Sequence, residues 1–297
     1  MKLGMVGLGK MGANMAERLR QHGHEVVGFD PFSEASSVAT LEELVAALPS
    51  PRMVWVMVPA GDPTEETVTA LAGLLAPDDV VIEGGNSNWR DSTRRAAALA
   101  EHGVGFIDSG TSGGVLGLTE GYCLMVGGTP AHVAVAQPIF DALAPVGGFV
   151  HTGPAGTGHF TKMVHNGIEY GLMQAYAEGY ELLVRSGLDI DVTGALSAWR
   201  QGSVVRSWLL ELLVRALEQR PGLEGLEGIA QDSGEGRWTV QEAIERRVAT
   251  PVISAALNAR FVSQDDNRIA MRAIAALREQ FGGHAVSTDG SPGGGTQ

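Results

Sequence analysis

Short runs of apolar residues alternate with amphipathic stretches through the first half of the chain. Apolar runs bounded by turn residues predict buried strands, and apolar positions at helical spacing predict helices that pack on one side. Alternation of this kind predicts an α/β domain with a mostly parallel, doubly wound sheet of the Rossmann type. Strands are expected at residues 2–6, 25–29, 53–58, 80–83, 104–107, 123–126 and 149–151, and helices at 11–21, 64–75, 91–101 and 131–143.

The pattern changes after a glycine-rich segment at residues 153–158. From there to about residue 280 the periodicity is helical, with almost no strand signal. The first helix is expected to run from residue 158 to about 186, which is longer than most helices of globular proteins. The expected division is an α/β domain at 1–157, an all-α C-terminal domain at 158–286, and a disordered tail at 287–297, which is rich in glycine and serine.

Composition narrows the possible partners and the compartment. A net charge of −13 argues against nucleic-acid and anionic-membrane partners, because both require basic patches. The single cysteine, Cys123, cannot form an intrachain disulfide and favours a reducing compartment. The sequence has no signal-peptide pattern and no apolar run near the ~18 residues of a membrane span, so a cytoplasmic location is expected.

Three glycines with dinucleotide-binding spacing, Gly7, Gly9 and Gly12, follow the first expected strand and open the first expected helix. Such glycines permit a tight turn and let the backbone approach a pyrophosphate at the helix N-terminus. Asp30 closes the second expected strand, eighteen residues after Gly12. A carboxylate there accepts hydrogen bonds from the adenosine ribose and repels a 2′-phosphate, although a turn role before Pro31 is the alternative. We therefore expect NAD as the cofactor, rather than NADP.

The first expected helix of the C-terminal domain carries an unusual polar face. At about 100° per residue, Lys162, Asn166 and Glu169 fall within roughly 60° of one another. Lys162 is one of only three lysines in a chain with eighteen arginines. An amine and a carboxylate on one face can serve as a general base and a general acid on one substrate. The alternative is an exposed ion pair, which is the commoner fate of helical charges.

Several segments together resemble decarboxylating 6-phosphogluconate dehydrogenases, and specifically their shorter, NAD-preferring branch. Residues 162–171, with the sequence Lys-Met-Val-His-Asn-Gly-Ile-Glu-Tyr-Gly, are the most specific of these segments. The resemblance implies hydride transfer from C3 of 6-phosphogluconate to the nicotinamide, followed by loss of carbon dioxide and protonation of an enediol to give ribulose 5-phosphate. It implies no metal. The other matching segments are residues 7–12, 54–61, 82–87, 109–114, 205–207 and 278–284.

The resemblance also implies residue roles, with residues 1–157 as the NAD-binding domain and 158–286 as a substrate and oligomerisation domain. Lys162 corresponds to the proton acceptor and Glu169 to the proton donor, with Asn166 placed to orient the reacting oxygen. The implied cofactor contacts are Gly7, Leu8, Gly9, Lys10, Met11, Gly12, Asp30, Val58, Pro59, Ala60 and Asn86. The implied substrate contacts are Asn86, Ser112, Gly113, Gly114, His165, Asn166, Tyr170, Arg206, Arg237, Arg278 and His284.

Three of the implied phosphate ligands raise particular points. Arg278 and His284 correspond to positions that are often supplied by a neighbouring subunit, so a homodimer or homotetramer is expected. Arg237 lies in the segment Gly234-Glu235-Gly236-Arg237-Trp238, where the family has a Gly-Thr-Gly-Lys-Trp-like sequence. The replacement of lysine by arginine keeps the charge and changes the hydrogen-bonding geometry.

A general base at Lys162 must be neutral, and a free lysine at neutral pH is not. We expect burial and cationic neighbours to lower its pKa. Asp108, which precedes a glycine-rich segment, is expected to form a turn, and His151 and His159 are expected to have structural roles.

Two other functions compete with the first. A related β-hydroxyacid dehydrogenase of the 3-hydroxyisobutyrate type has similar glycine-rich and lysine motifs, but His165, Tyr170, Arg278 and His284 favour a phosphorylated sugar acid. The other alternative is a non-catalytic NAD-binding sensor of sugar acids. The presence of both Lys162 and Glu169 argues against the sensor.

Overall fold

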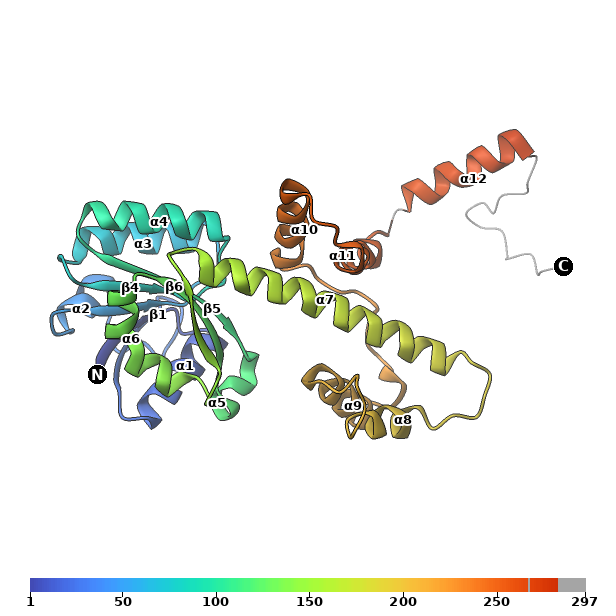
Figure 1. Cartoon of the computed structure of the whole chain (residues 1–297), viewed down its shortest axis with the longest axis horizontal. Coiled ribbons are helices and arrows are strands. Elements are labelled where there is room, and N and C mark those ends of the chain that lie inside the picture. Colours follow the sequence, from blue (N-terminus) through green and yellow to red (C-terminus); the bar gives the residue numbers. More distant parts are fainter. Residues whose placement is uncertain (267, 283–297) are drawn as a thin grey trace. The chain divides into compact units, whose positions relative to one another are not determined.

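The computed structural model describes residues 1–266 and 268–282 (Figure 1). The chain forms two compact units. The first comprises residues 1–172 and 233–253, and the second comprises residues 173–232 and the chain from residue 254 onward. The expected tail at 287–297 and His284 lie outside the described residues.

The first unit is built on a seven-stranded sheet in the order β2-β1-β3-β4-β5-β6-β7. Every neighbouring pair is parallel except β5 and β6, which are antiparallel. The expectation of a mostly parallel doubly wound sheet is therefore confirmed. The strands are β1 (Lys2–Val6), β2 (Glu25–Phe29), β3 (Met53–Val56), β4 (Val80–Glu83), β5 (Gly105–Ser112), β6 (Cys123–Gly128) and β7 (Phe149–Gly153).

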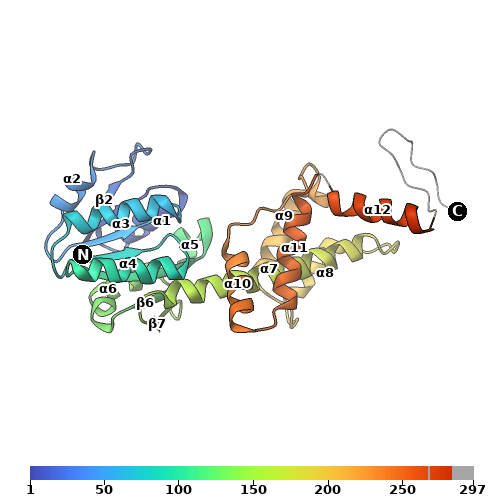
Figure 2. The same ribbon diagram turned by 90° about the horizontal axis from the view of Figure 1, so that it is seen from above.

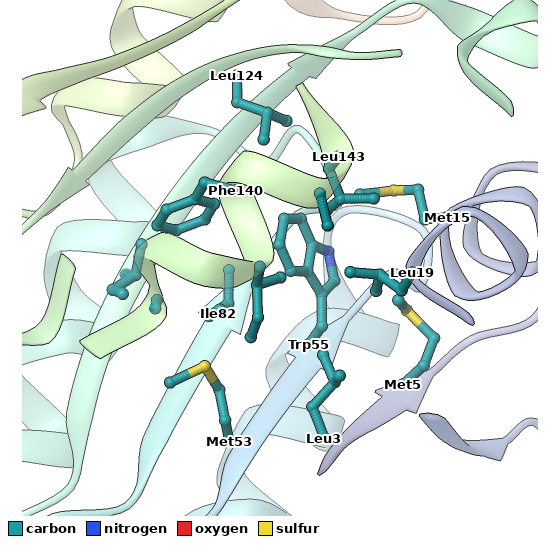
Figure 3. Packing of buried hydrophobic residues seen from close by; sticks show 14 of the residues in the cluster. Leu3, Met5, Met15, Leu19, Met53, Trp55, Ile82, Leu124, Phe140 and Leu143 are labelled. Atoms are coloured by element: carbon teal, nitrogen blue, oxygen red, sulfur yellow. The ribbon is translucent and has the colours of Figure 1, made fainter. Parts of the chain in front are cut away.

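Helices cover both faces of this sheet, which explains why its strands are continuously apolar instead of alternating. On one face α1 (Lys10–Gln21) and α6 (Pro130–Leu143) pack against a core centred on Trp55. The Trp55 and Phe140 rings meet edge to face, with centroids 6.1 Å apart (Figure 3). On the other face α2 (Leu41–Ala46), α3 (Asp62–Leu74) and α4 (Trp89–Glu101) cover a second core. In Figure 2, α3 and α4 lie side by side over the sheet.

A long helix, α7 (Thr157–Val184), follows β7. Its first half belongs to the first unit, together with α10 (Glu235–Arg246), which arrives from much later in the sequence. The hydroxyl of Thr239 in α10 donates to the carbonyl of Met163 at 2.7 Å. At the other end of α10, Glu242 accepts from Trp89 at 3.1 Å and pairs with Arg90 at 2.6 Å. The first unit therefore extends past residue 157, because α10 packs against the start of α7 and pairs with residues at the start of α4.

The second unit contains helices and loops, with no strand among its described residues. It contains the second half of α7, together with α8 (Val192–Trp199), α9 (Trp208–Gln219), a 3-10 turn (Pro221–Leu223), most of α11 (Pro251–Ser263) and α12 (Ile269–Gly282). A small core gathers Leu196 with Leu210, Val214 and Leu217. Tyr176 of α7 holds the segment before α9 by donating to the carbonyl of Val205 at 2.6 Å. None of the helices described is long and apolar enough to span a membrane.

Candidate active site

A cavity of about 790 Å³ opens at the carboxyl ends of β1 to β4 in the first unit. Its floor is the glycine-rich turn between β1 and α1. Gly7 has φ +92°, and a Cβ on Gly12 would overlap the carbonyl oxygen of Gly7, so both positions require glycine. A Cβ on Gly9 would meet nothing within 4 Å, so this glycine leaves open space above the helix N-terminus. The turn has the shape that a pyrophosphate requires.

Most of the expected cofactor contacts line this cavity. They are Gly7, Gly9, Lys10, Met11, Gly12, Asp30, Val58, Pro59 and Asn86. Two do not line it. Leu8 is 7% exposed and packs in the core around Trp55, and Ala60 is exposed beyond the end of β3.

Asp30 makes a turn contact and also lines the cavity. One carboxylate oxygen accepts the N–H of Phe32 at 2.9 Å, which is a turn contact. The other accepts the N–H of Leu8 at 2.8 Å, inside the glycine-rich turn. Backbone donors therefore hold the carboxylate in place at the wall of the cavity.

The polar face of α7 is assembled as its spacing indicates. The Lys162 Nζ donates to the Asn166 side-chain oxygen at 2.6 Å and lies 3.3 Å from His165 Nδ1. His165 Nδ1 is 2.9 Å from the same Asn166 oxygen and 3.8 Å from a carboxylate oxygen of Glu169. An amine, an imidazole and a carboxylate therefore lie in sequence along one helical face.

Burial dominates the electrostatics of this face. Lys162 is 5% exposed, and the loss of hydration lowers the pKa of its amine. The charges that act on Lys162 are not the cations expected from the sequence. Glu169 and Glu235 oppose the effect of burial by stabilising the ammonium, so that expectation was wrong about the neighbours.

Further substrate candidates lie together where β4 and β5 end. The Asn86 amide donates to the Thr111 carbonyl at 3.1 Å and accepts the Thr111 N–H at 3.0 Å. The next residue, Ser112, has its hydroxyl 3.5 Å from His165 Nε2. Gly113 and Gly114 follow with φ of +132° and +54°, and they turn the chain away from the strand. Asn86, which lines the cavity, is thus linked through Thr111 and Ser112 to the polar face of α7.

A hydrogen-bonded network at the start of α10 reaches Tyr170, and its buried residue, Glu235, was not expected from the sequence. The Tyr170 hydroxyl lies 3.2 Å from the Ser233 hydroxyl, which donates to Glu235 at 2.6 Å. Glu235 is 9% exposed, whereas Arg237 on the same helix is exposed. Nothing in the sequence separates Glu235 from a surface glutamate, because its burial depends on how α10 packs against α7.

Asp108 is not the turn residue that its sequence position indicated. It lies within β5, which runs on to Ser112 because β6 pairs with it antiparallel. Its carboxylate is fully buried and accepts the N–H groups of Gly156 at 2.6 Å and His159 at 2.7 Å. His159 has the expected structural role, with Nδ1 2.7 Å from the Ser92 hydroxyl, and His151 Nε2 lies 2.9 Å from the carbonyls of Gly128 and Gly153.

The other phosphate candidates belong to the second unit. Arg206 precedes α9 and Arg278 lies in α12, and both side chains are exposed. Among the described residues, no group of three or more histidine, cysteine, aspartate or glutamate side chains is arranged to hold a metal ion.

Comparisons with known proteins point to one family. The sequence model for the NAD binding domain of 6-phosphogluconate dehydrogenase matches residues 2–153, and the model for the C-terminal domain of that enzyme matches residues 158–290. An NAD(+)-dependent, decarboxylating 6-phosphogluconate dehydrogenase of Haloferax volcanii is 42% identical over 97% of this chain and 99% of its own length. An enzyme of the same description from Bacillus subtilis is 34% identical over 92% of this chain, which spans 64% of the longer protein.

A solved structure extends the likeness to the backbone. The 6-phosphogluconate dehydrogenase of Plasmodium falciparum, studied with NADP+ and with 6-phosphogluconate, superposes with a TM-score of 0.81 at 27% identity. The match covers 99% of this chain and 67% of that protein.

Proposed function

Because this chain belongs to the 6-phosphogluconate dehydrogenase family, we propose that it catalyses the NAD-dependent oxidative decarboxylation of 6-phosphogluconate to ribulose 5-phosphate and carbon dioxide. One observation carries the proposal. Asn86 lines the dinucleotide cavity and also holds Thr111, next to the serine that faces His165. We infer that a substrate bound along the polar face of α7 places its reacting carbon near Asn86, at the wall of the cavity.

Lys162 is the residue that takes the first proton. The nicotinamide, when bound, supplies the hydride acceptor. The buried amine is neutral more readily than a free lysine and accepts the proton of the C3 hydroxyl as the hydride leaves. The resulting ammonium then stabilises negative charge on the C3 oxygen while carbon dioxide departs. Glu169 and Glu235 favour that ammonium, so the site supports both states of the lysine.

Glu169 supplies the last proton. Its side chain is 34% exposed and lies on the same face as Lys162. His165 lies between the two, with its Nδ1 3.8 Å from a carboxylate oxygen of Glu169. A protonated carboxyl at this place can donate to C1 of the enediol. Asn166, held by Lys162 and His165, orients the reacting oxygen between the acid and the base.

The preference for NAD rests on the charge around Asp30. The cavity is lined by the carboxylates of Asp30 and Glu66, and Lys10 is its one cation among the described residues. Residues 25–51, which include the turn after β2, contain no lysine or arginine. A 2′-phosphate in this position would meet a fixed carboxylate and no guanidinium.

We also propose that the protein acts as a homodimer or homotetramer. Apolar side chains are exposed along the helices of the second unit, including Val262 at 74%, Ile269 at 70% and Leu277 at 62%. A second copy of the chain would cover them and, as in the family, could bring Arg278 and His284 to its partner's phosphate site. Light scattering at assay concentration tests this proposal, and a mass corresponding to a monomer would contradict it.

A spectrophotometric assay at about 340 nm tests the activity. The expected result is NADH formation with 6-phosphogluconate, and little or none with gluconate or 3-hydroxyisobutyrate. Turnover of 3-hydroxyisobutyrate without turnover of 6-phosphogluconate would replace the proposed substrate. A higher kcat/KM with NADP than with NAD would refute the cofactor preference and leave the reaction intact.

A further inference from the structure

The N-terminus of the lysine-bearing helix is attached to the sheet by one buried carboxylate. The two oxygens of Asp108 accept different backbone donors, Gly156 at 2.6 Å and His159 at 2.7 Å. These donors flank Thr157, where α7 begins. The first N–H groups of a helix have no partner within the helix, and a carboxylate that accepts two of them satisfies both and benefits from the helix dipole.

Close backbone packing fixes the position of the first turn of α7. A Cβ on Gly158 would lie 2.5 Å from the Met125 carbonyl oxygen and 2.6 Å from the carbonyl oxygen of Asp108. A Cβ on Gly110 would meet the side chain of Lys162 and lie 2.8 Å from the Gly158 carbonyl oxygen. The first turns of α7 therefore rest directly on β5 and β6. From the opposite side, Ser92 of α4 holds the ring of His159 at 2.7 Å.

Lys162 follows His159 by less than one helical turn, so any change in the tilt or depth of the helix start moves its amine. We propose that Asp108 is a positioning residue for Lys162, and that its carboxylate sets where the amine meets the substrate hydroxyl and the cofactor. This inference rests on the proposed function, because it takes Lys162 as the base. Asp108 itself lies behind the helix and has no contact with the reacting groups. Its effect passes through the backbone of α7.

The surroundings of Asp108 act on the pKa of its carboxyl in both directions, and burial is the largest influence. Burial raises the pKa of its carboxyl, and the neighbouring Glu83 acts in the same direction. His159 and the two backbone donors act in the opposite direction and favour the anion. An asparagine would keep the shape but could accept only one of the two N–H groups, because its amide nitrogen would face the other.

The test is a single-turnover measurement with enzyme in excess over 6-phosphogluconate and with NAD saturating. In Asp108→Asn the rate of NADH formation should fall about 10- to 100-fold, the loss expected from a displacement of the base of about 1 Å. The amplitude and the affinity for NADH should stay within about twofold of wild type. A purely structural role would lower the folded fraction, measured by circular dichroism, and would leave the rate unchanged as long as folded enzyme stays in excess over substrate.

Asp79→Asn is the matched control. Asp79 is equally buried, and it accepts the backbone N–H groups of Arg52 and Ala76 at the opposite ends of the strands. This variant should lose stability and folded fraction while its single-turnover rate stays within about twofold of wild type. An equal fall in rate in both aspartate variants would overturn the positioning role.

Ser92→Ala provides a milder change if Asp108→Asn does not fold. It removes one hydrogen bond to the same helical turn, so the rate should fall by about fivefold at most, again at constant amplitude. A wild-type rate in every folded variant would overturn the positioning role of Asp108. Absence of NADH formation by the wild-type enzyme would instead refute the proposed function.

Discussion

The Lys162 amine donates to the side-chain oxygen of Asn166, one helical turn away, at 2.6 Å. The contact directs a buried amine along the helix toward His165 and Glu169, so the proposed general base and the proposed general acid share one rigid element. Their separation then depends on helix geometry and not on the docking of two loops.

Replacing Lys162 with methionine should remove the base and keep the volume of its side chain. We expect kcat to fall by about 10²- to 10⁴-fold, with NADH affinity unchanged, in steady-state and fluorescence-binding measurements. Lys2→Met is the control, because Lys2 forms an ion pair with Glu25 at 2.7 Å on β1 and β2. Normal turnover by Lys162→Met would exclude the lysine as the base.

The same substitution should stabilise the fold, with a definite pH dependence. Burial lowers the pKa of Lys162, so the unfolded chain binds more protons than the folded chain between the two pKa values. The penalty is complete below the folded pKa and disappears as the pH rises to the ordinary lysine value. The melting temperature of Lys162→Met should therefore exceed that of wild type at about pH 7, by a margin that narrows at higher pH. A margin that widens with pH would contradict this sign.

Glu169→Gln should impair the protonation of the enediol, because an amide cannot donate an acidic proton. We expect kcat to fall by about 10²- to 10⁴-fold with little change in NADH affinity. Glu178→Gln on the same helix is the control, since Glu178 makes only a hydrogen bond with Gln174 at 2.9 Å among the described contacts. If the two variants were equally active, Glu169 would not be the required acid.

Gly110→Ala tests whether the close packing of α7 on β5 is needed for activity. The added methyl group would overlap the Lys162 side chain and the Gly158 backbone, so α7 must move and activity should fall by about 10-fold or more. At Gly73, in α3, the same substitution would meet nothing within 4 Å. Gly73→Ala should leave activity unchanged and stabilise the protein by about 0.5–1 kcal/mol, measured by denaturant unfolding. Full activity in Gly110→Ala would show that activity does not depend on the exact position of α7.

Asp30→Asn should weaken the preference for NAD. The amide oxygen can still accept the N–H of Leu8, but the charge that repels a 2′-phosphate is gone. We expect the ratio of kcat/KM for NAD over NADP to fall by about 10- to 100-fold. Glu34→Gln removes a charge from the same turn outside the cavity lining and should change the ratio little. A ratio unaffected by Asp30→Asn would locate the discrimination elsewhere.

Local pattern was sufficient for much of the fold. The strands at residues 2–6, 25–29 and 80–83 have the bounds that their apolar runs predicted, because a strand between two helical layers must be apolar throughout. The short helix α2 escaped prediction because its six residues are too few to display a helical period.

The end of β5 could not be found from local pattern. Residues 108–112 read as a turn because they are small and polar, yet they form a strand because β6 pairs with them from Ser112 back to Ile107. Hydrogen bonds between strands depend on a partner that is distant in the sequence, so the sequence of one segment does not predict them.

The sequence by itself determined the glycine turn with Asp30 after it, and the shared face of Lys162, Asn166 and Glu169. Both follow from spacing within a single element, which the backbone geometry of that element converts directly into proximity. Only the tertiary structure decided that Asp108 accepts hydrogen bonds from the start of α7 and that Glu235 is buried near Tyr170. It also decided that Asn86, in the cavity wall, forms a hydrogen bond with Thr111 at the end of β5. Those contacts join residues far apart in the chain, and they exist because packing excludes water from charged groups that must then find partners.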